Sequence, residues 1–253
     1  MRVLVSPKSR SSRLFPGLLS SMAGCPVLAS AVYGTPTDVS VAGVACPWLA
    51  GFPDGTDGYG GDYAPYQSPA LVPIATPAGS SFTVASATGT VSKGAPYPYY
   101  APDGIEGDAG GSEQGPFGGI GYLLAPKVSL IGVFLDDTVP VDSPPAGFSF
   151  FSPSDRDFLI LSPALRQPFF IGDGRTSSNV VQEFLAPVGA RRLFLGVMDR
   201  QQWYDNLGSF SVALDVVPEP STVLLLLVAS GMARRRRWRT WRMPCATPSG
   251  SME

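Results

Sequence analysis

The chain contains no histidine and only three cysteines in 253 residues. The lack of histidine excludes catalytic pairs in which a histidine activates serine or cysteine, and it excludes zinc sites with histidine ligands. Glycine-rich stretches occur, but none follows a strand and opens a helix, as phosphate-binding loops require. These absences predict a protein that is not an enzyme of these classes.

Basic residues are scarce in the central part of the chain. Between residues 32 and 218 there are 8 basic and 18 acidic residues, a net charge of about −10. A body this acidic repels nucleic acid and attracts cations, so we expect no nucleic-acid partner. A glycosidase remains an alternative, because two carboxylates are sufficient for glycoside hydrolysis.

Long helical patterns are also lacking, whereas Gly (29) and Pro (26) are abundant. Such a composition favours strands and turns. About nine short strands separated by turn residues predict an all-β fold, a two-sheet antiparallel β-sandwich spanning residues 32–216. The expected strands lie at 37–45, 70–75, 81–91, 128–135, 157–161, 168–171, 180–185, from 192 and from 209. Residues 53–68, 94–126 and 140–154 are expected to be long loops, the first of them solvated.

The N-terminal segment 1–31 resembles a secretory signal peptide. A basic start precedes an apolar run from Leu14 to Leu28, and Ala29-Ser30-Ala31 is a small-residue cleavage site. A lipidated Cys25 within a weak lipobox is the alternative. Cleavage after Ala31 would leave Cys46 and Cys245, too few cysteines for a disulfide framework.

The C-terminal segment 217–242 carries three features in a fixed order. Pro218-Glu219-Pro220 is followed by an apolar run, Val223 to Ala233, and then by the arginines 234–237. This order resembles the PEP-CTERM sorting signal, which in Gram-negative bacteria is processed by an exosortase. The resemblance implies transient membrane insertion through a short helix, contact with the secretion machinery, and export through the inner membrane to the cell surface or extracellular matrix.

This segment departs from a full membrane span in length. The eleven-residue run would cover only about 16 Å as a helix, against roughly 30 Å of hydrocarbon. Residues 243–253 form an extension of unknown role. The alternative interpretation is a buried helix with a solvated basic end.

Three oxygen-bearing side chains, Asp199, Asp205 and Asn206, lie between the strands that start at 192 and 209. Ca²⁺ binds six to eight oxygen ligands, and a loop between two paired strands would bring these groups together. An ordinary hairpin turn is the alternative, because Asp, Asn and Gly are also common turn residues.

The same stretch resembles the calcium loop of the small galactophilic bacterial lectins, a β-sandwich family. Asp199 matches the first aspartate of that loop, Asp205-Asn206 match its asparagine pair, and residues 208–212 match the following strand. Residues 82–94 resemble the strand whose end contributes a carbonyl oxygen. The resemblance implies a lectin-like, galactose-binding-domain-like fold with one Ca²⁺. The implied metal ligands are Asp199, Asp205, Asn206 and the backbone oxygens of Lys93 and of Gln202 or Trp203.

The resemblance also implies that the calcium ion holds a sugar, here a carbohydrate of the extracellular matrix. The histidine of the family's sugar loop is absent, but tyrosines next to acidic side chains can stack on a sugar and accept its hydroxyl hydrogens. The expected carbohydrate-binding residues are Asp199, Asn206, Asp103, Tyr99 and Tyr100. A structural matrix protein that binds no sugar is the alternative. Asp136, Asp137 and Asp142 form a second, weaker candidate for a cation site.

Overall fold

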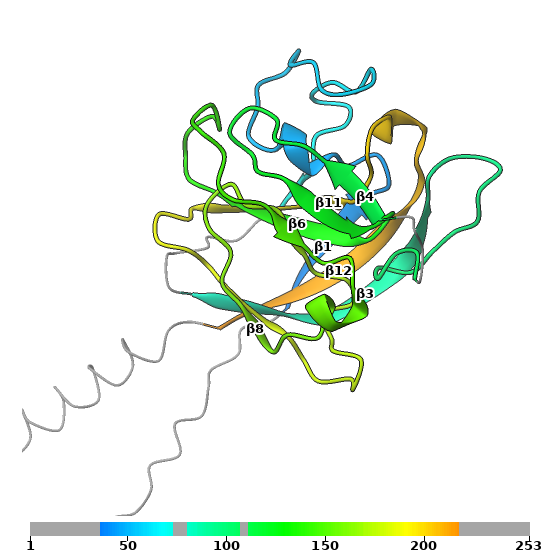
Figure 1. Ribbon diagram of the computed structural model, residues 1–253, viewed down its shortest axis with the longest axis vertical. Helices are drawn as coiled ribbons and strands as arrows, with labels where there is room; N and C mark the ends of the chain where they lie inside the picture. The colour runs from blue at the N-terminus through cyan, green and yellow to red at the C-terminus, as the bar shows by residue number, and fades with distance from the viewer. Residues whose placement is uncertain (1–35, 73–79, 107–110, 218–253) are drawn as a thin grey trace, which may run out of the picture. The chain divides into compact units, whose positions relative to one another are not determined.

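The computed structural model describes residues 36–72, 80–106 and 111–217. The predicted segments 1–31 and 243–253, and the sorting signal 217–242 apart from Val217, lie outside them. Within the described ranges the chain forms twelve strands and three short 3₁₀ helices (Figure 1). The elements are β1 (Thr37–Ala42), η1 (Pro47–Leu49), β2 (Ala70–Leu71), β3 (Ser81–Ser92), β4 (Gly111–Gln114), β5 (Leu123–Pro126), β6 (Leu130–Leu135), β7 (Phe148–Ser149), η2 (Pro153–Arg156), β8 (Ile160–Leu161), β9 (Phe169–Phe170), β10 (Glu183–Leu185), β11 (Arg192–Val197), η3 (Trp203–Asp205) and β12 (Leu207–Val217).

The strands form three sheets. A five-stranded sheet has the order β1-β12-β3-β10-β8, a four-stranded sheet the order β2-β11-β6-β9, and a three-stranded sheet the order β4-β5-β7. In Figure 1, β6 and β11 lie in a layer above β12 and β3. The predicted all-β, sandwich-like architecture is therefore confirmed. The prediction of two purely antiparallel sheets is wrong in detail, because a third sheet is present and β8–β10 and β5–β7 pair in parallel.

The third sheet arises from segments that we expected to be loops. Strands β4 and β5 fall within 94–126, and β7 falls within 140–154. These strands have two to four residues each, so they are too short for a period-two pattern to stand out in the sequence. They were missed for that reason.

The core lies between the five-stranded and four-stranded sheets. Phe82 and Phe184 of one sheet stack at 4.9 Å between ring centroids, and Phe134 and Phe169 of the other lie 5.4 Å apart. Phe82 also meets Phe134 across the layers at 5.8 Å. Such aromatic pairs add to the burial of apolar area that stabilises a sandwich core.

Strand β12 confirms the predicted alternation. Phe210 and Val212 are fully buried, whereas Ser209 and Ser211 face solvent. Phe194 on β11 is buried as expected, but β11 is buried at almost every position, because β1 and η1 pack against it in addition to its sheet neighbours β2 and β6. No helix among the described residues is both long and apolar enough to span a bilayer.

Candidate functional site

The segment from Met198 to Asn206 connects two different sheets. Strand β11 belongs to the four-stranded sheet, whereas β12 pairs with β1 and β3 in the five-stranded sheet. Our expectation of a loop between two paired strands is therefore wrong, and so is the hairpin alternative. The segment instead crosses from one layer of the sandwich to the other.

Trp203 anchors this connection in the core. Its side chain is fully buried, its indole N–H donates to the Val197 carbonyl at 2.7 Å, and its ring lies 5.7 Å from that of Trp48. Trp48 in turn donates to the Gly121 carbonyl. The sequence interpretation considered only the backbone oxygen of Trp203, and the structural role of the side chain was missed.

Asp199 is a buried carboxylate. Its side chain is 7% exposed, and one carboxylate oxygen accepts the N–H of Arg200 at 2.6 Å. Burial raises the pKa of Asp199, and the nearby Asp205 charge raises it further, whereas hydrogen bonds from Arg200 and Asn206 and the Lys127 charge lower it. Burial is the largest of these effects, so ionising Asp199 costs more free energy in the folded protein than in water.

Asn206 presents an unsatisfied acceptor. Its side chain is 3% exposed, and its amide nitrogen donates to the Gly43 carbonyl at 3.1 Å. The amide oxygen, Oδ1, is buried and has no hydrogen-bond partner within the described part of the chain. An unsatisfied buried acceptor lowers the folding stability by about 1–3 kcal/mol, and a bound ligand would remove this cost.

Asp205 packs against the residue that follows Lys93. Gly94 has φ +94°, and a Cβ at this position would lie 3.1 Å from the Asp205 carbonyl oxygen and 3.4 Å from its carboxylate. A larger residue would therefore be strained and would push into Asp205. Asp205 thus lies next to the Gly94 backbone, at the end of β3. Asp199 interacts with both Asp205 and Asn206, at the end of β11 and the start of β12.

Gln202 adopts a strained backbone conformation. Its φ of 68° and ψ of 43° are left-handed, which costs a non-glycine residue about 1–2 kcal/mol. The N–H groups of Gln202 and Tyr204 donate to the two carboxylate oxygens of Asp62, at 3.1 and 2.9 Å. Asp62 is 1% exposed, and its burial raises its pKa. The backbone N–H groups of Tyr204, Trp203 and Gln202 have the smaller, opposite effect and lower the pKa.

Asp62 is the main residue that the sequence analysis missed. It lies within the segment 53–68 that we expected to be a solvated loop, and at this position the expectation is wrong. The loop residues Asp54 and Asp57 are exposed, as expected. Nothing local distinguishes Asp62 from them, because its partners are 140 and 142 residues away in the sequence.

The candidate donor set contains amide and backbone oxygens as well as carboxylates. In the described ranges, no group of three or more Asp, Glu, Cys or His side chains is arranged to hold a metal ion. Two carboxylates, the free Asn206 oxygen and backbone carbonyls are, however, the ligands that Ca²⁺ prefers. The carbonyls of Gln202 and Trp203 accept hydrogen bonds from Asp205 (3.3 Å) and Asn206 (3.1 Å), and each oxygen keeps a second lone pair.

The structure separates the predicted carbohydrate-binding residues. Tyr99 is half exposed, and its ring would lie 3.2 Å from a Cβ on Gly208. Gly208 is on β12, two residues after Asn206, so Tyr99 packs near the start of that strand. Tyr100 pairs through its backbone with Val91 and packs on the core. Asp103 instead faces Asp173, Glu106 and Arg156.

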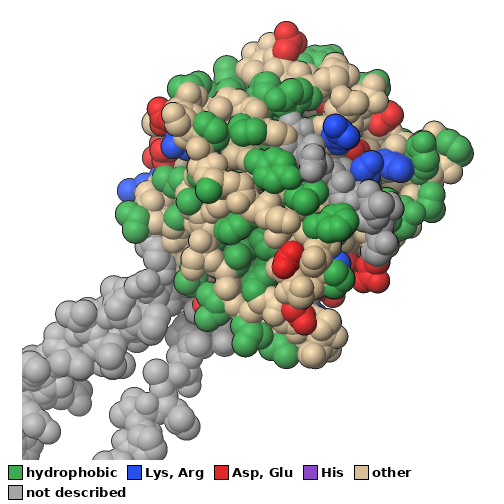
Figure 2. Space-filling view, viewed as in Figure 1, with side chains coloured by type: hydrophobic (Ala, Val, Ile, Leu, Met, Phe, Trp, Pro, Cys, Tyr) green, Lys and Arg blue, Asp and Glu red, His purple; other side chains and the backbone are tan. Residues whose placement is uncertain are grey.

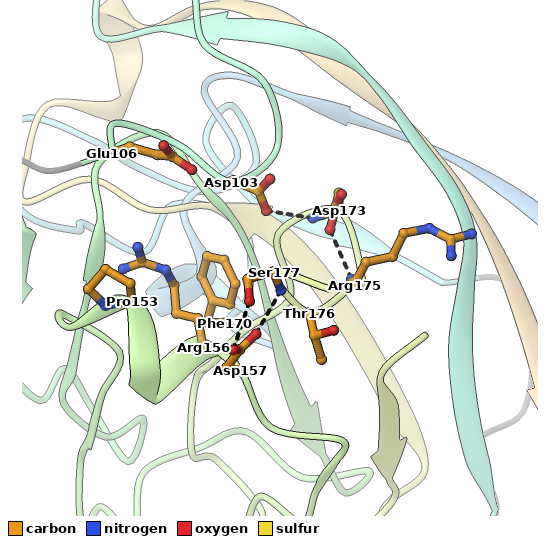
Figure 3. A pocket seen from close by; sticks show the side chains of 10 residues that line it. All are labelled: Asp103, Glu106, Pro153, Arg156, Asp157, Phe170, Asp173, Arg175, Thr176 and Ser177. Carbon is orange, nitrogen blue, oxygen red and sulfur yellow. Dashed lines mark hydrogen bonds between the residues drawn. The ribbon is translucent and has the colours of Figure 1, made fainter. Parts of the chain in front are cut away.

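Figure 3 shows the pocket that contains Asp103. Its volume is about 130 Å³, and the loop at Asp103–Glu106, η2 and the segment 170–177 line it. Three of its carboxylates accept backbone N–H groups, Asp103 from Asp173, Asp173 from Arg175 and Asp157 from Ser177. Burial raises the pKa of Asp103. Because ligand pockets usually measure about 300–1,000 Å³, we interpret this group as a connection between loops.

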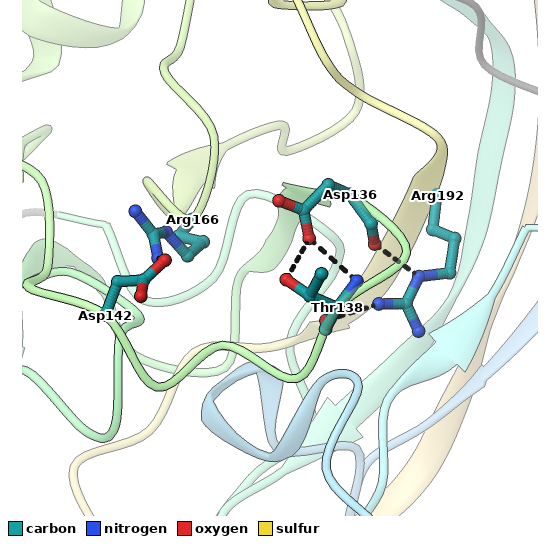
Figure 4. A network of polar contacts seen from close by, with 5 residues as sticks. All are labelled: Asp136, Thr138, Asp142, Arg166 and Arg192. Atoms are coloured by element: carbon teal, nitrogen blue, oxygen red, sulfur yellow. Dashed lines mark hydrogen bonds and ion pairs between the residues drawn. The ribbon is translucent and has the colours of Figure 1, made fainter.

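At the second candidate cation site, Asp136 and Asp142 form hydrogen bonds and an ion pair with other side chains (Figure 4). Asp136 accepts the N–H and hydroxyl of Thr138, at 2.9 and 2.6 Å, and Asp142 forms an ion pair with Arg166 at 2.6 Å. Arg192 donates to the carbonyls of Asp136 and Thr138. This network closes the loop after β6 and gives no support to a metal site there.

On the face seen in Figure 2, charged side chains are scattered among apolar and uncharged ones, without a broad patch of either sign. Comparisons with protein-family models, curated proteins and solved structures found no match.

Proposed function

We propose that this chain is an exported, surface-sorted, non-enzymatic β-sandwich protein that binds Ca²⁺ and, through it, carbohydrate of the extracellular matrix. In fold it would be lectin-like and galactose-binding-domain-like. The observation that carries the proposal is the pair Asp199 and Asn206. The Asn206 amide N–H group hydrogen-bonds the buried Asp199 carboxylate, and the buried amide oxygen of Asn206 has no partner among the described residues.

The proposed ligands are the carboxylates of Asp199 and Asp205, the Oδ1 atom of Asn206, and the backbone oxygens of Lys93 and of Gln202 or Trp203. Of the last two, the Gln202 carbonyl has the longer hydrogen bond, 3.3 Å against 3.1 Å, and is the easier to recruit. Two carboxylates would balance a divalent charge. When bound, the ion would supply positive charge and open coordination positions for sugar hydroxyls.

Two tyrosines near the candidate ligands are exposed. Tyr99 lies against Gly208, and Tyr204 is in η3, within the loop itself; they are 54% and 49% exposed. An exposed aromatic ring next to a bound cation offers a sugar an apolar face and a hydroxyl that hydrogen-bonds. Tyr99 is therefore the stronger candidate for sugar contact than Tyr100 or Asp103.

Export and sorting rest on the sequence alone. The signal-like segment 1–31 would direct secretion, and Pro218-Glu219-Pro220 with the following apolar run and arginines would be recognised by an exosortase. A carbohydrate-binding body on such a carrier would be delivered to the cell surface, where extracellular polysaccharide is available.

A glycan array, probed with and without EDTA, tests the proposal. We expect calcium-dependent binding to a subset of glycans, no binding by Asp199→Asn, and weakened binding by Tyr99→Ala with calcium binding intact. Ser211→Ala, on an exposed position of β12, serves as the control. Calcium binding without any glycan binding would support the structural matrix protein instead. Turnover of a polysaccharide would contradict the non-enzymatic proposal.

A further inference from the structure

We infer that Asp62 is the positioning residue of the calcium loop, which it holds from a distant part of the chain. The inference rests on the proposed function. Its basis is that both carboxylate oxygens of Asp62 accept backbone N–H groups of the loop, from Gln202 at 3.1 Å and from Tyr204 at 2.9 Å. The backbone N–H of Trp203 also lowers the pKa of Asp62.

These hydrogen bonds set the direction of the candidate carbonyl ligands. In a trans peptide the N–H and C=O groups point in opposite directions. By accepting the N–H of Tyr204, Asp62 therefore fixes the orientation of the Trp203 carbonyl, and by accepting the N–H of Gln202 it holds the peptide that precedes Gln202. The Trp203 carbonyl is one of the two candidate backbone ligands, and the Gln202 carbonyl belongs to the peptide between the two that Asp62 holds.

Asp62 also stabilises the left-handed backbone of Gln202. Strained residues persist when their surroundings hold them in place, and they cluster at ligand sites. Here the surroundings include Asp62, which accepts the Gln202 N–H, and Gly60, where a Cβ would lie 3.1 Å from the Gln202 side chain and 3.2 Å from its nitrogen. Trp203, buried in the core, fixes the next residue.

The segment that carries Asp62 is itself closed by backbone hydrogen bonds. The Asp62 N–H donates to the Tyr59 carbonyl at 3.1 Å, and the Gly58 N–H donates to the Asp62 carbonyl at 2.7 Å. This turn presents the carboxylate as a rigid acceptor. Burying a carboxylate is costly, and a role in pre-organising the site accounts for the presence of Asp62.

Calcium titration of the full chain and three variants tests this role, with isothermal calorimetry for affinity and circular dichroism to confirm folding. Asp62→Asn replaces one acceptor oxygen by an amide that donates. Asp62→Glu keeps the charge but moves the carboxylate by one methylene. Asp54→Asn, at an exposed position of the same segment, removes a charge without touching the loop.

We expect the calcium dissociation constant to rise at least tenfold in both Asp62 variants and to stay within twofold of the parent in Asp54→Asn. Parental affinity in Asp62→Glu with weak binding in Asp62→Asn would mean that Asp62 acts by charge, and would overturn the inference. Parental affinity in both variants, with only the melting temperature lowered, would show a merely structural role and overturn it too.

If neither Asp62 variant folds, hydrogen exchange of the parent chain in EDTA decides. Protected amides at Gln202 and Tyr204 support a loop held without metal, whereas protection that appears only with calcium overturns the inference. The parent also separates this question from the proposed function. If it binds no calcium, the proposed function and the inference fail together; if it binds calcium and the Asp62 variants bind equally well, only the inference fails.

Discussion

Replacing Asp199 by asparagine should stabilise the metal-free protein and abolish its response to calcium. The Asp199 carboxylate is 7% exposed, and burial raises its pKa, so its ionised form lowers the stability of the metal-free fold at neutral pH. Asparagine has the same shape and keeps an oxygen for the Arg200 N–H, which donates at 2.6 Å. The buried charge is removed while the hydrogen bond remains.

The calcium response has a calculable size. A ligand that binds only the folded state at 100 times its dissociation constant adds about 2.7 kcal/mol of stability. For a domain of this size about 1 kcal/mol shifts the melting temperature by about 2–4 °C, so the parent should gain roughly 5–11 °C in calcium over EDTA. Asp199→Asn should melt higher than the parent in EDTA and show no gain in calcium.

Thermal melts of parent, Asp199→Asn and the exposed strand-end control Asp137→Asn, each in calcium and in EDTA, make the comparison. The control should keep the full calcium gain. Equal melting temperatures of the parent in calcium and EDTA would refute the site. A calcium gain retained by Asp199→Asn, or a large loss of its stability in EDTA, would show that Asp199 is a structural residue and not a ligand.

Three further predictions concern pH, the core and sorting. The pKa of Asp199 is raised in the folded protein, so the metal-free fold gains stability as the pH falls through that pKa. Calcium needs the ionised form, so the calcium gain in melting temperature should begin to shrink at a pH above the ordinary pKa of about 3.9. A gain that stays constant down to about pH 4 would contradict this. Phe210→Ala should cost about 3–5 kcal/mol in urea unfolding, because the ring is fully buried, and a loss like that of Ser211→Ala would contradict the packing. Glu219→Ala should leave a longer, membrane-retained product in cells, and identical mature masses for mutant and parent would argue against exosortase processing.

The long strands were predictable because their patterns are strong. The alternation of Phe210 and Val212 with serines, and the apolar run at 130–135, correctly predicted strands that pack face to face in a sandwich. The sheet to which each strand belongs was not predictable. Strands β11 and β12 are adjacent in sequence and read as a hairpin, yet they lie in different layers, because pairing is decided by partners such as β6 and β3 that are far away in the chain.

The candidate ligands were predictable only as far as they are local. Asp199, Asp205 and Asn206 lie within eight residues, and the structure brings them together. Asp103 lies in a different pocket, where it faces Asp173 and Arg156. The supporting residues were missed, since Asp62 and Gly43 reach the loop across 140 and 163 residues, and a single sequence carries no signal for such contacts.

The place of the candidate site in the fold explains why a cation there would affect the whole domain. Asp199 follows a strand of the four-stranded sheet, whereas Lys93 and Asn206 adjoin strands of the five-stranded sheet. An ion bound to all three would join the layers at the end where Trp48 and Trp203 close the core. Unfolding would then have to release the ion before the sheets separate. The stabilisation by calcium should therefore appear in the global transition, and not as local ordering of one loop.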